Sequence, residues 1–181
     1  MKLIKLCNLI YYKILSANKV AKIKGVHFGK NCKFLTKNFG SEPYLIYIGD
    51  NFYSSSNVNF ITHDGSVNVL RNLYKEYKNI DYIAPIIIGN NVFIGNGSTI
   101  LPGAIIEDNI IIGAGSIVKG KLKSNSVYAG VPAKHISSLE DYKEKNKKYF
   151  LNTKSLNKKD KKLFLKEWLK KRYPTLGIKE Q

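Results

Sequence analysis

Three histidines occur in this 181-residue sequence, and His63 is distinguished from the other two by its neighbours. It lies in the segment Thr62-His63-Asp64-Gly65, where the imidazole is followed directly by a carboxylate and a glycine. An imidazole is suited to proton transfer because its ordinary pKa lies near neutral pH. His63 is therefore a candidate general base, although a lone histidine is more often structural, and its place in the repeat of the sequence bears on this choice. We expect His27 and His135 to be structural or surface residues.

A six-residue period positions this histidine. Starting at Ile88, aliphatic residues recur every six positions, and a second set of mostly small or aliphatic residues follows four positions after each of them. The first set is Ile88, Ile94, Ile100, Ile106, Ile112 and Val118, and the second is Val92, Ser98, Ala104, Ile110, Ser116 and Leu122. Such a period fits neither an α-helix nor an ordinary strand, and it is typical of a parallel β-helix. We predict a mainly β protein in which each hexapeptide supplies one short strand and one turn.

The period is interrupted twice. Two extra residues fall near Gly40 to Tyr47, and a longer break covers residues 62–84. An interruption in a solenoid is a loop that leaves one face, and such loops often bind ligands. His63 lies where the longer break begins, so we expect the candidate base at the foot of a protruding loop, 62–84.

We divide the chain into three parts. Residues 1–19 are predicted to form a short amphipathic helix over one end of the core, residues 20–136 a β-helix, and residues 137–181 a basic helical extension that caps the solenoid or packs along it. Apolar residues at helical spacing support both helical parts, and Pro174 is expected to end the last helix. The N-terminal segment lacks the apolar stretch and cleavage site of a signal peptide, so we expect a cytoplasmic protein. The alternative role for the N-terminal helix is weak contact with a membrane surface.

The formal net charge of +17 is distributed unevenly. Residues 1–19 carry +4, residues 20–136 carry +5 and residues 137–181 carry +8. Arg71 and Arg172 are the only arginines, and the most basic part is not the part that carries the repeat. We therefore expect no nucleic-acid partner, although a basic surface still attracts anionic ligands. The two cysteines, Cys7 and Cys32, show no metal-ligand spacing and demand no disulfide.

Several motifs in the repeat are specific enough to indicate a family. They are Pro85-Ile86-Ile87-Ile88-Gly89-Asn90-Asn91-Val92-Phe93-Ile94-Gly95, Ile100-Leu101-Pro102-Gly103-Ala104, Ile112-Gly113-Ala114-Gly115-Ser116-Ile117-Val118 and the closing Tyr128-Ala129-Gly130-Val131-Pro132-Ala133-Lys134. Over residues 45–136 the chain resembles the hexapeptide-repeat acetyltransferases, closest in style to the galactoside, maltose and bacterial-polysaccharide O-acetyltransferases. The resemblance implies a left-handed parallel β-helix, a homotrimer with each active site between two subunits, acetyl-CoA as co-substrate and no metal.

The same resemblance implies a reaction. An acetyl group would pass from acetyl-CoA to a sugar hydroxyl on a polysaccharide, an oligosaccharide or a lipid-linked sugar precursor, and His63 matches the placement of the family's catalytic histidine. The alternative is N-acetylation of an amino sugar or nucleotide sugar on the same scaffold. Enzymes of that kind often add an N-terminal nucleotide-binding domain, and this sequence shows none, which favours O-acetylation.

Three further residues are candidates for binding the acceptor. Asn57 aligns with an asparagine of the family pattern and is also suited to an ordinary corner. Asp64 follows His63, but neighbours in an extended chain point to opposite sides, so a turn with Gly65 is equally expected. Arg71 is suited either to binding an acidic sugar or to ordering the loop, and the sequence does not separate these two roles.

For coenzyme A, the resemblance indicates residues on several coils. It assigns the backbone amide of Ser55 to the thioester, Phe93 and Asn96 to the pantetheine arm, the backbone of Ala114 to the same ligand, and Lys119 and Lys134 to the phosphates. Phe93 stands where relatives often have tryptophan. Gly120 stands where some relatives have lysine, so one phosphate contact is expected to be missing.

Two other functions fit the same fold. A carbonic anhydrase-like zinc site needs three converging histidines, but the two-residue slip near Gly40 spoils the register between His27 and His63. A scaffold without catalytic activity would bind neither coenzyme A nor an acceptor. The sequence favours the acetyltransferase over both.

Overall fold

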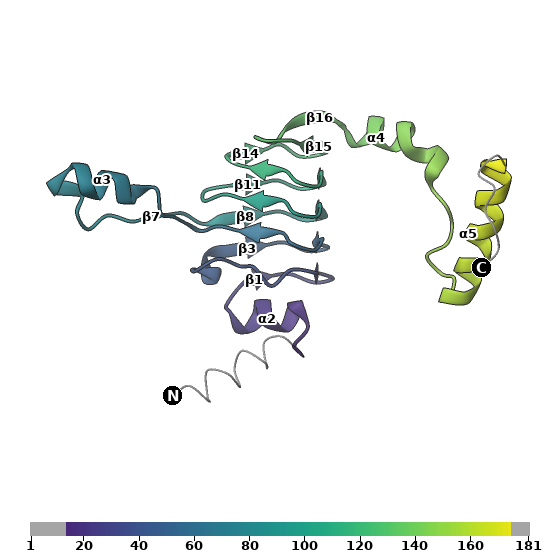
Figure 1. The fold of residues 1–181 in the computed structure, drawn as a ribbon, viewed down its shortest axis with the longest axis horizontal. Helices are drawn as coiled ribbons and strands as arrows, with labels where there is room; N and C mark the ends of the chain where they lie inside the picture. Colours follow the sequence, from purple (N-terminus) through teal and green to yellow (C-terminus); the bar gives the residue numbers. More distant parts are fainter. Residues whose placement is uncertain (1–13, 175–181) are drawn as a thin grey trace. The chain divides into compact units, whose positions relative to one another are not determined.

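The computed structural model describes residues 14–174, and within that range the strands form a three-sided parallel solenoid and a separate hairpin (Figure 1). Sheet A contains β1 (His27–Phe28), β3 (Ile46–Ile48), β8 (Ile86–Ile88), β11 (Ile105–Ile106) and β14 (Lys121–Leu122). Sheet B contains β2 (Lys33–Phe34), β4 (Tyr53–Ser54), β9 (Val92–Ile94), β12 (Ile110–Ile112), β15 (Ser126–Ala129) and β16 (Lys134–Ser138). Sheet C contains β5 (Asn59–Phe60), β10 (Thr99–Ile100) and β13 (Ile117–Val118). The chain passes from A to B to C in the three coils that contain β5, β10 and β13, and β16 ends the solenoid by pairing antiparallel to β15.

The six-residue period is confirmed as the repeat of this solenoid. Ile88 pairs with Ile106 on sheet A, Ile94 with Ile112 on sheet B, and Ile100 with Val118 on sheet C, so that three hexapeptides make one regular coil. All of these aliphatic side chains are buried. The second set, four positions later, is buried as well. Stacked inward side chains and hydrogen bonds between successive coils therefore form one continuous core.

The coil length changes where the sequence broke its period. Phe28 pairs with Ile48, which makes this coil two positions longer than three hexapeptides and confirms the two-residue insertion. Ile48 pairs with Ile88, and the much longer coil between them contains the loop. A third change was missed: Ile106 pairs with Leu122, which makes that coil two positions shorter than a regular one. Leu122 therefore begins a new coil and is not the second-set residue of the preceding hexapeptide. The short turn through Gly120, at φ +67°, makes this tight corner feasible.

Asparagines form one corner of the solenoid, between sheets A and B. Asn31, Asn51, Asn91, Asn109 and Asn125 occupy it with φ between 54° and 59°. Asparagine tolerates this left-handed conformation better than most residues. The side-chain amides of Asn91 and Asn109 also donate to the next asparagine along the axis, each over 2.9 Å. The corner thus combines the required backbone conformation with a ladder of hydrogen bonds.

The hairpin leaves the solenoid between β5 and β8, where sheet C turns into sheet A (Figure 1). It consists of β6 (His63–Asp64) and β7 (Tyr82–Ile83), which pair antiparallel. Between them lie α3 (Val67–Leu73) and the 3₁₀ helix η2 (Lys75–Tyr77). A second 3₁₀ helix, η1 (Pro43–Leu45), lies in the two-residue insertion at the same corner, one coil earlier.

At the N-terminal end, α2 (Ala17–Ile23) closes the core. Val20 and Ala21 are buried in it. The Asn18 side chain donates to the carbonyl of Cys32 over 2.7 Å and accepts from the amide of Phe34 over 3.1 Å. It thus satisfies backbone groups of the first strand on sheet B, which would otherwise form an open edge. Most of the helix predicted over residues 1–19 lies outside the described residues.

The chain separates into two compact units, Met1–Lys143 and Glu144–Gln181. Helix α4 (Leu139–Asn146) crosses this boundary, and the second unit contains the 3₁₀ helix η3 (Lys147–Tyr149) and α5 (Lys158–Arg172). Whether these C-terminal helices cover the solenoid stays a prediction. None of the described helices combines the length and the apolar character needed to cross a membrane.

We predict that Gly95→Ala destabilises the solenoid. A Cβ added at Gly95 would lie 2.4 Å from the backbone nitrogen of Ala114 in the next coil, and two stacked backbones cannot easily separate. We expect the free energy of unfolding, measured by urea denaturation, to fall by about 1–3 kcal/mol. Gly65→Ala is the matched control, because no atom lies within 4 Å of the added Cβ. A loss of stability in the control equal to that of Gly95→Ala would contradict this account.

Candidate active site

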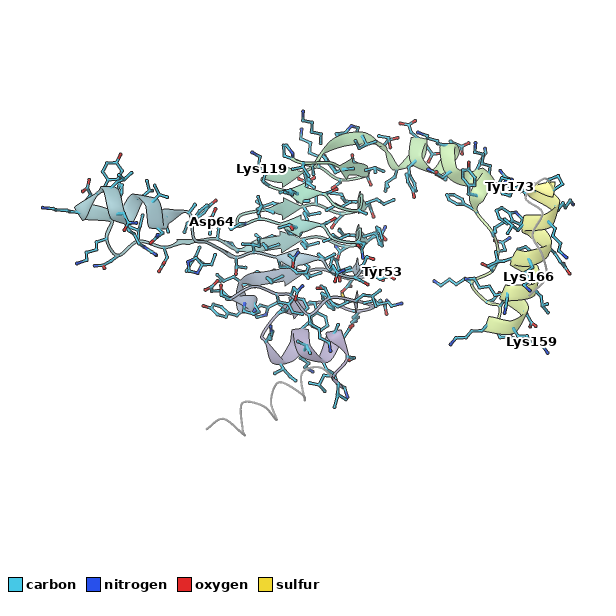
Figure 2. All side chains as sticks on the ribbon, viewed as in Figure 1. Tyr53, Asp64, Lys119, Lys159, Lys166 and Tyr173 are labelled. Carbon is cyan, nitrogen blue, oxygen red and sulfur yellow. The ribbon has the colours of Figure 1, made fainter. Side chains whose placement is uncertain are left out.

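The candidate base lies at the foot of the protruding hairpin. His63 is the first residue of β6, and its side chain is 31% exposed. Figure 2 shows its neighbour Asp64 at the point where the hairpin leaves the solenoid. Because β6 pairs with β7, the returning strand brings residues near position 82 back to the same place. The imidazole is therefore open to a ligand on one side and surrounded by protein on the others.

A carboxylate that the sequence analysis missed lies against one nitrogen of His63. Glu42 Oε1 is 3.4 Å from His63 Nδ1. The other oxygen, Oε2, accepts hydrogen bonds from the Ser41 hydroxyl over 2.7 Å and from the buried Thr62 hydroxyl over 3.0 Å. Glu42 is thus held in place by its neighbours while it faces the imidazole.

These contacts also keep Glu42 ionised. The pKa of its carboxyl is lowered by the Ser41 hydrogen bond, and further by the Thr62 hydrogen bond and the nearby His63, although desolvation opposes them. A carboxyl whose pKa is lowered in the folded protein stabilises the fold at pH values above its ordinary pKa. This stabilisation is lost only as the pH falls through the lowered pKa. At neutral pH Glu42 therefore presents a charged acceptor to Nδ1.

A second carboxylate lies near the other nitrogen. Asp81 Oδ1 is 3.5 Å from His63 Nε2, and the same oxygen forms an ion pair with the Arg71 guanidinium. Arg71 Nε also donates to the carbonyl of Ile80 over 2.7 Å. Arg71 therefore orders the loop, which is one of the two roles that the sequence left open. The Asp81 side chain is half exposed, and its carboxylate is shared between His63 and Arg71.

The arrangement is suited to general base catalysis. A neutral imidazole whose Nδ1–H donates to a carboxylate has its lone pair on Nε2, which is the pattern in which an acid orients a histidine base. Glu42 would also stabilise the imidazolium that forms when Nε2 takes up a proton. Asp81, next to Nε2, lies where an incoming hydroxyl or amine could be positioned.

The other predicted acceptor residues make local structural contacts, and their binding of an acceptor stays a prediction. Asp64 Oδ1 accepts the amide of Ser66 over 2.9 Å, so Asp64 forms the turn after His63 and its pKa is lowered by that bond. Asn57 is exposed at the corner between sheets B and C with φ 57°. That conformation fits the ordinary corner role that the sequence analysis set beside acceptor binding.

The predicted coenzyme A residues lie on two sides of the solenoid. Phe93 is on the outer face of sheet B, where its ring packs edge-on against Tyr53 at 5.4 Å between centroids. These two residues help to line a groove of about 320 Å³ along β4, β9 and β12. Asn96 and Ala114 lie at the adjoining corner between sheets B and C, where the carbonyl of Asn96 accepts the amide of Gly115 over 2.8 Å.

Other predicted contacts are placed differently. The amide of Ser55 donates to the carbonyl of Ile94 over 2.9 Å, so it is used within the chain and is not free to face a thioester. Lys134 is exposed at the start of β16. Lys119 is exposed at the corner between sheets C and A, the corner from which the hairpin leaves (Figure 2). One chain therefore places His63 and Lys119 at one corner, opposite the face that carries Phe93.

The register contained a signal for the missed Glu42. Glu42 lies at the two-residue insertion, in the lengthened coil. Thr62 follows it by the length of that coil and therefore stacks beside it, and the Thr62 hydroxyl donates a hydrogen bond to Glu42. Counting the insertion into the coil length would have stacked Glu42 directly beside Thr62 and His63. Asp81 had a weaker signal, because only the antiparallel return of the loop brings it back to His63.

We predict that Glu42 sets the tautomer of His63. In the wild-type protein at neutral pH, the imidazole ¹⁵N chemical shifts should report a proton on Nδ1, because Glu42 accepts it. In Glu42→Ala we expect the population to move toward the Nε2–H form. Glu76→Ala removes a carboxylate from the same loop and should leave the tautomer unchanged. Identical ¹⁵N shifts in wild type and Glu42→Ala would exclude this role.

Comparison with known proteins agrees with this fold. Residues 85–120 match the family model described as bacterial transferase hexapeptide (six repeats). The chain is 45% identical over 154 residues to protein CapG of Staphylococcus aureus, covering 83% of this chain and 87% of that protein. It is 38% identical over 120 residues to the galactoside O-acetyltransferase of Escherichia coli, covering 64% of this chain but only 55% of that enzyme. The chain thus spans about half the length of the latter relative.

A solved structure extends the comparison to the fold. Galactoside acetyltransferase in complex with coenzyme A matches with a TM-score of 0.51 and 32% sequence identity, over 65% of this chain and 67% of that one. The predicted fold class, a left-handed parallel β-helix, is confirmed. The extent of the match to CapG, together with the repeat, shows that the chain belongs to the hexapeptide-repeat family of bacterial transferases, among its acetyltransferases.

Proposed function

We propose that this chain transfers the acetyl group of acetyl-CoA to a hydroxyl of a sugar acceptor, with His63 as the general base. The observation that carries the proposal is the partly exposed imidazole of His63, which lies between two carboxylates: Glu42 is 3.4 Å from Nδ1 and Asp81 is 3.5 Å from Nε2. The names of the relatives support the donor and the acceptor class. The solved galactoside acetyltransferase is in complex with coenzyme A, and the relative from Escherichia coli is named a galactoside O-acetyltransferase.

The proposed reaction uses this geometry. Nε2 of His63 takes the proton of the acceptor hydroxyl while its oxygen attacks the thioester carbonyl and forms the new C–O bond. The tetrahedral intermediate then collapses, the C–S bond breaks, and the imidazolium returns its proton to the departing thiolate of coenzyme A. Glu42 stabilises the imidazolium between these two steps. The amide of Ser55 is already donated, so the donors to the oxyanion must come from another group.

The chain's own residues fit coenzyme A as a ligand. The groove on sheet B offers aromatic and aliphatic side chains, including Phe93, to the pantetheine arm. The exposed ammonium groups of Lys119 and Lys134 are suited to phosphates, since charge-assisted hydrogen bonds to phosphate are stronger than neutral ones. The separation of Phe93 from His63 within one chain supports a site that two neighbouring chains share.

We predict that His63→Ala abolishes acetyl transfer while coenzyme A binding persists. Loss of a general base lowers the rate by about 10²–10⁴-fold, and the mutated side chain is not among the predicted cofactor contacts. Release of the free thiol measures turnover, and calorimetry measures binding. His27→Ala is the control, because His27 is exposed and its ring stacks on Tyr47.

The acceptor panel should contain neutral and acidic sugars, oligosaccharides and amino sugars. Turnover of hydroxyl acceptors supports O-acetylation. Turnover of amino sugars alone would replace it by the N-acetylation alternative, and full activity of His63→Ala would overturn the role of the histidine. Neither turnover nor coenzyme A binding in the wild-type protein would favour a scaffold.

We further predict that the protein is a homotrimer in solution. A shared site requires sheet B of one chain to meet the hairpin corner of another, and a closed three-fold ring allows this contact three times. Light scattering coupled to size exclusion should give three times the chain mass of 20.5 kDa. A fully active monomer would contradict the shared site.

A further inference from the structure

The C-terminal unit contains a strongly basic helix that the proposed reaction does not use. Helix α5 spans 15 residues, of which eight are basic and two are acidic, a net charge of +6. This exceeds the +5 carried by residues 20–136 together. Figure 2 labels Lys159 and Lys166 on the helix and Tyr173 just beyond it.

Apolar side chains form a stripe along the middle of the same helix. Phe164, Leu165, Trp168 and Leu169 occupy two adjacent rows at helical spacing. None of the residues of α5 is buried, and Phe164 is 40% exposed. Leu165 and Leu169 line a shallow groove of about 430 Å³ whose other lining residues are Lys158, Lys161, Lys162 and Lys166. Ammonium groups thus surround a partly exposed apolar strip.

We propose that α5 binds an anionic membrane surface, lying in the plane of the headgroups. Charge complementarity argues for this occupant, since lysines attract anionic headgroups while aromatic and leucine side chains enter the boundary of the acyl chains. The rest of the chain offers no such complement, because residues 1–19 and 20–136 are themselves positive. The helix is about 22 Å long at 1.5 Å per residue and carries too many charges to span the bilayer.

Two features favour a lipid surface over a nucleic acid. Seven of the eight basic residues are lysines, whereas bidentate recognition of bases and phosphates favours arginine. The Trp168 ring packs edge-on against the Tyr173 ring, with 6.2 Å between centroids. The Arg172 guanidinium lies over both rings. Tryptophan and tyrosine are the side chains enriched where a protein meets the headgroup region. The membrane contact that the sequence suggested for the helix over residues 1–19 falls mostly outside the described residues, and α5 is a separate candidate.

The sequence offers a direct probe, because Trp168 is the only tryptophan in the chain. Full-length protein is titrated with vesicles of phosphatidylglycerol and phosphatidylcholine, and with vesicles of phosphatidylcholine alone. We expect a blue shift of the tryptophan emission and co-sedimentation with the anionic vesicles only, both reduced at high salt.

Matched variants distinguish the contribution of α5 to vesicle binding from that of the overall charge of the protein. Lys161→Gln/Lys162→Gln/Lys166→Gln should weaken the vesicle affinity by roughly a hundredfold, at about fivefold for each lysine near the surface. Lys22→Gln/Lys24→Gln/Lys30→Gln removes the same charge from exposed positions of the other unit and should change it far less. Phe164→Ala/Leu165→Ala keeps the helix propensity high and should reduce the blue shift.

Other outcomes would overturn the proposal. Equal binding to neutral vesicles, or equal loss in both lysine variants, would exclude a specific electrostatic role for α5. Binding of RNA or heparin without any blue shift on vesicles would identify an anionic polymer as the occupant. A large loss of thermal stability in Phe164→Ala/Leu165→Ala without vesicles would show that the apolar stripe packs against protein instead.

Discussion

The stacking of each coil on the next, whatever the length of the coil, is the constraint on which the rest of the solenoid depends. Inward aliphatic side chains fill the axis, and backbone groups pair between coils, so each coil is stable only beside its neighbours. Both requirements fix which residues turn outward, and those are the residues available for function. Phe93 and Tyr53 become neighbours on sheet B for this reason, although the whole hairpin separates them in the sequence.

Departures from this register create the candidate active site. The two-residue insertion brings Glu42 beside Thr62, and the longest coil sends out the hairpin that carries His63 and returns Asp81. Both departures occur at the corner between sheets C and A, in successive coils. The two carboxylates that contact the imidazole therefore lie at positions where the repeat is interrupted.

The sequence predicted the solenoid well because its physical cause, a buried aliphatic residue every six positions, is visible in the chain itself. It also placed His63 at the foot of the loop. The sequence did not predict the short coil that ends at Leu122. Because that coil is two residues shorter, Leu122 falls four positions after Val118, where an inward residue of the second set is expected anyway. The prediction of a free amide at Ser55 was wrong for a different reason. Whether a backbone amide is free depends on the next coil, and the amide of Ser55 donates to the carbonyl of Ile94 there. Glu42 and Asp81 required knowledge of spatial register, which residue types alone do not give.

The position of Lys119 has a consequence for the size of the ligand. Lys119 follows β13, and the hairpin follows β5, so both occupy the same corner with β10 in the coil between them. Adjacent strands lie about 4.8 Å apart, which makes the rise between these two levels about 10 Å. The number of coils between the hairpin and Lys119 therefore sets how long a ligand must be to contact both, and this length changes in steps of one coil. Inserting or deleting one whole coil between them would change that length by one increment and leave the contacts of His63 with Glu42 intact.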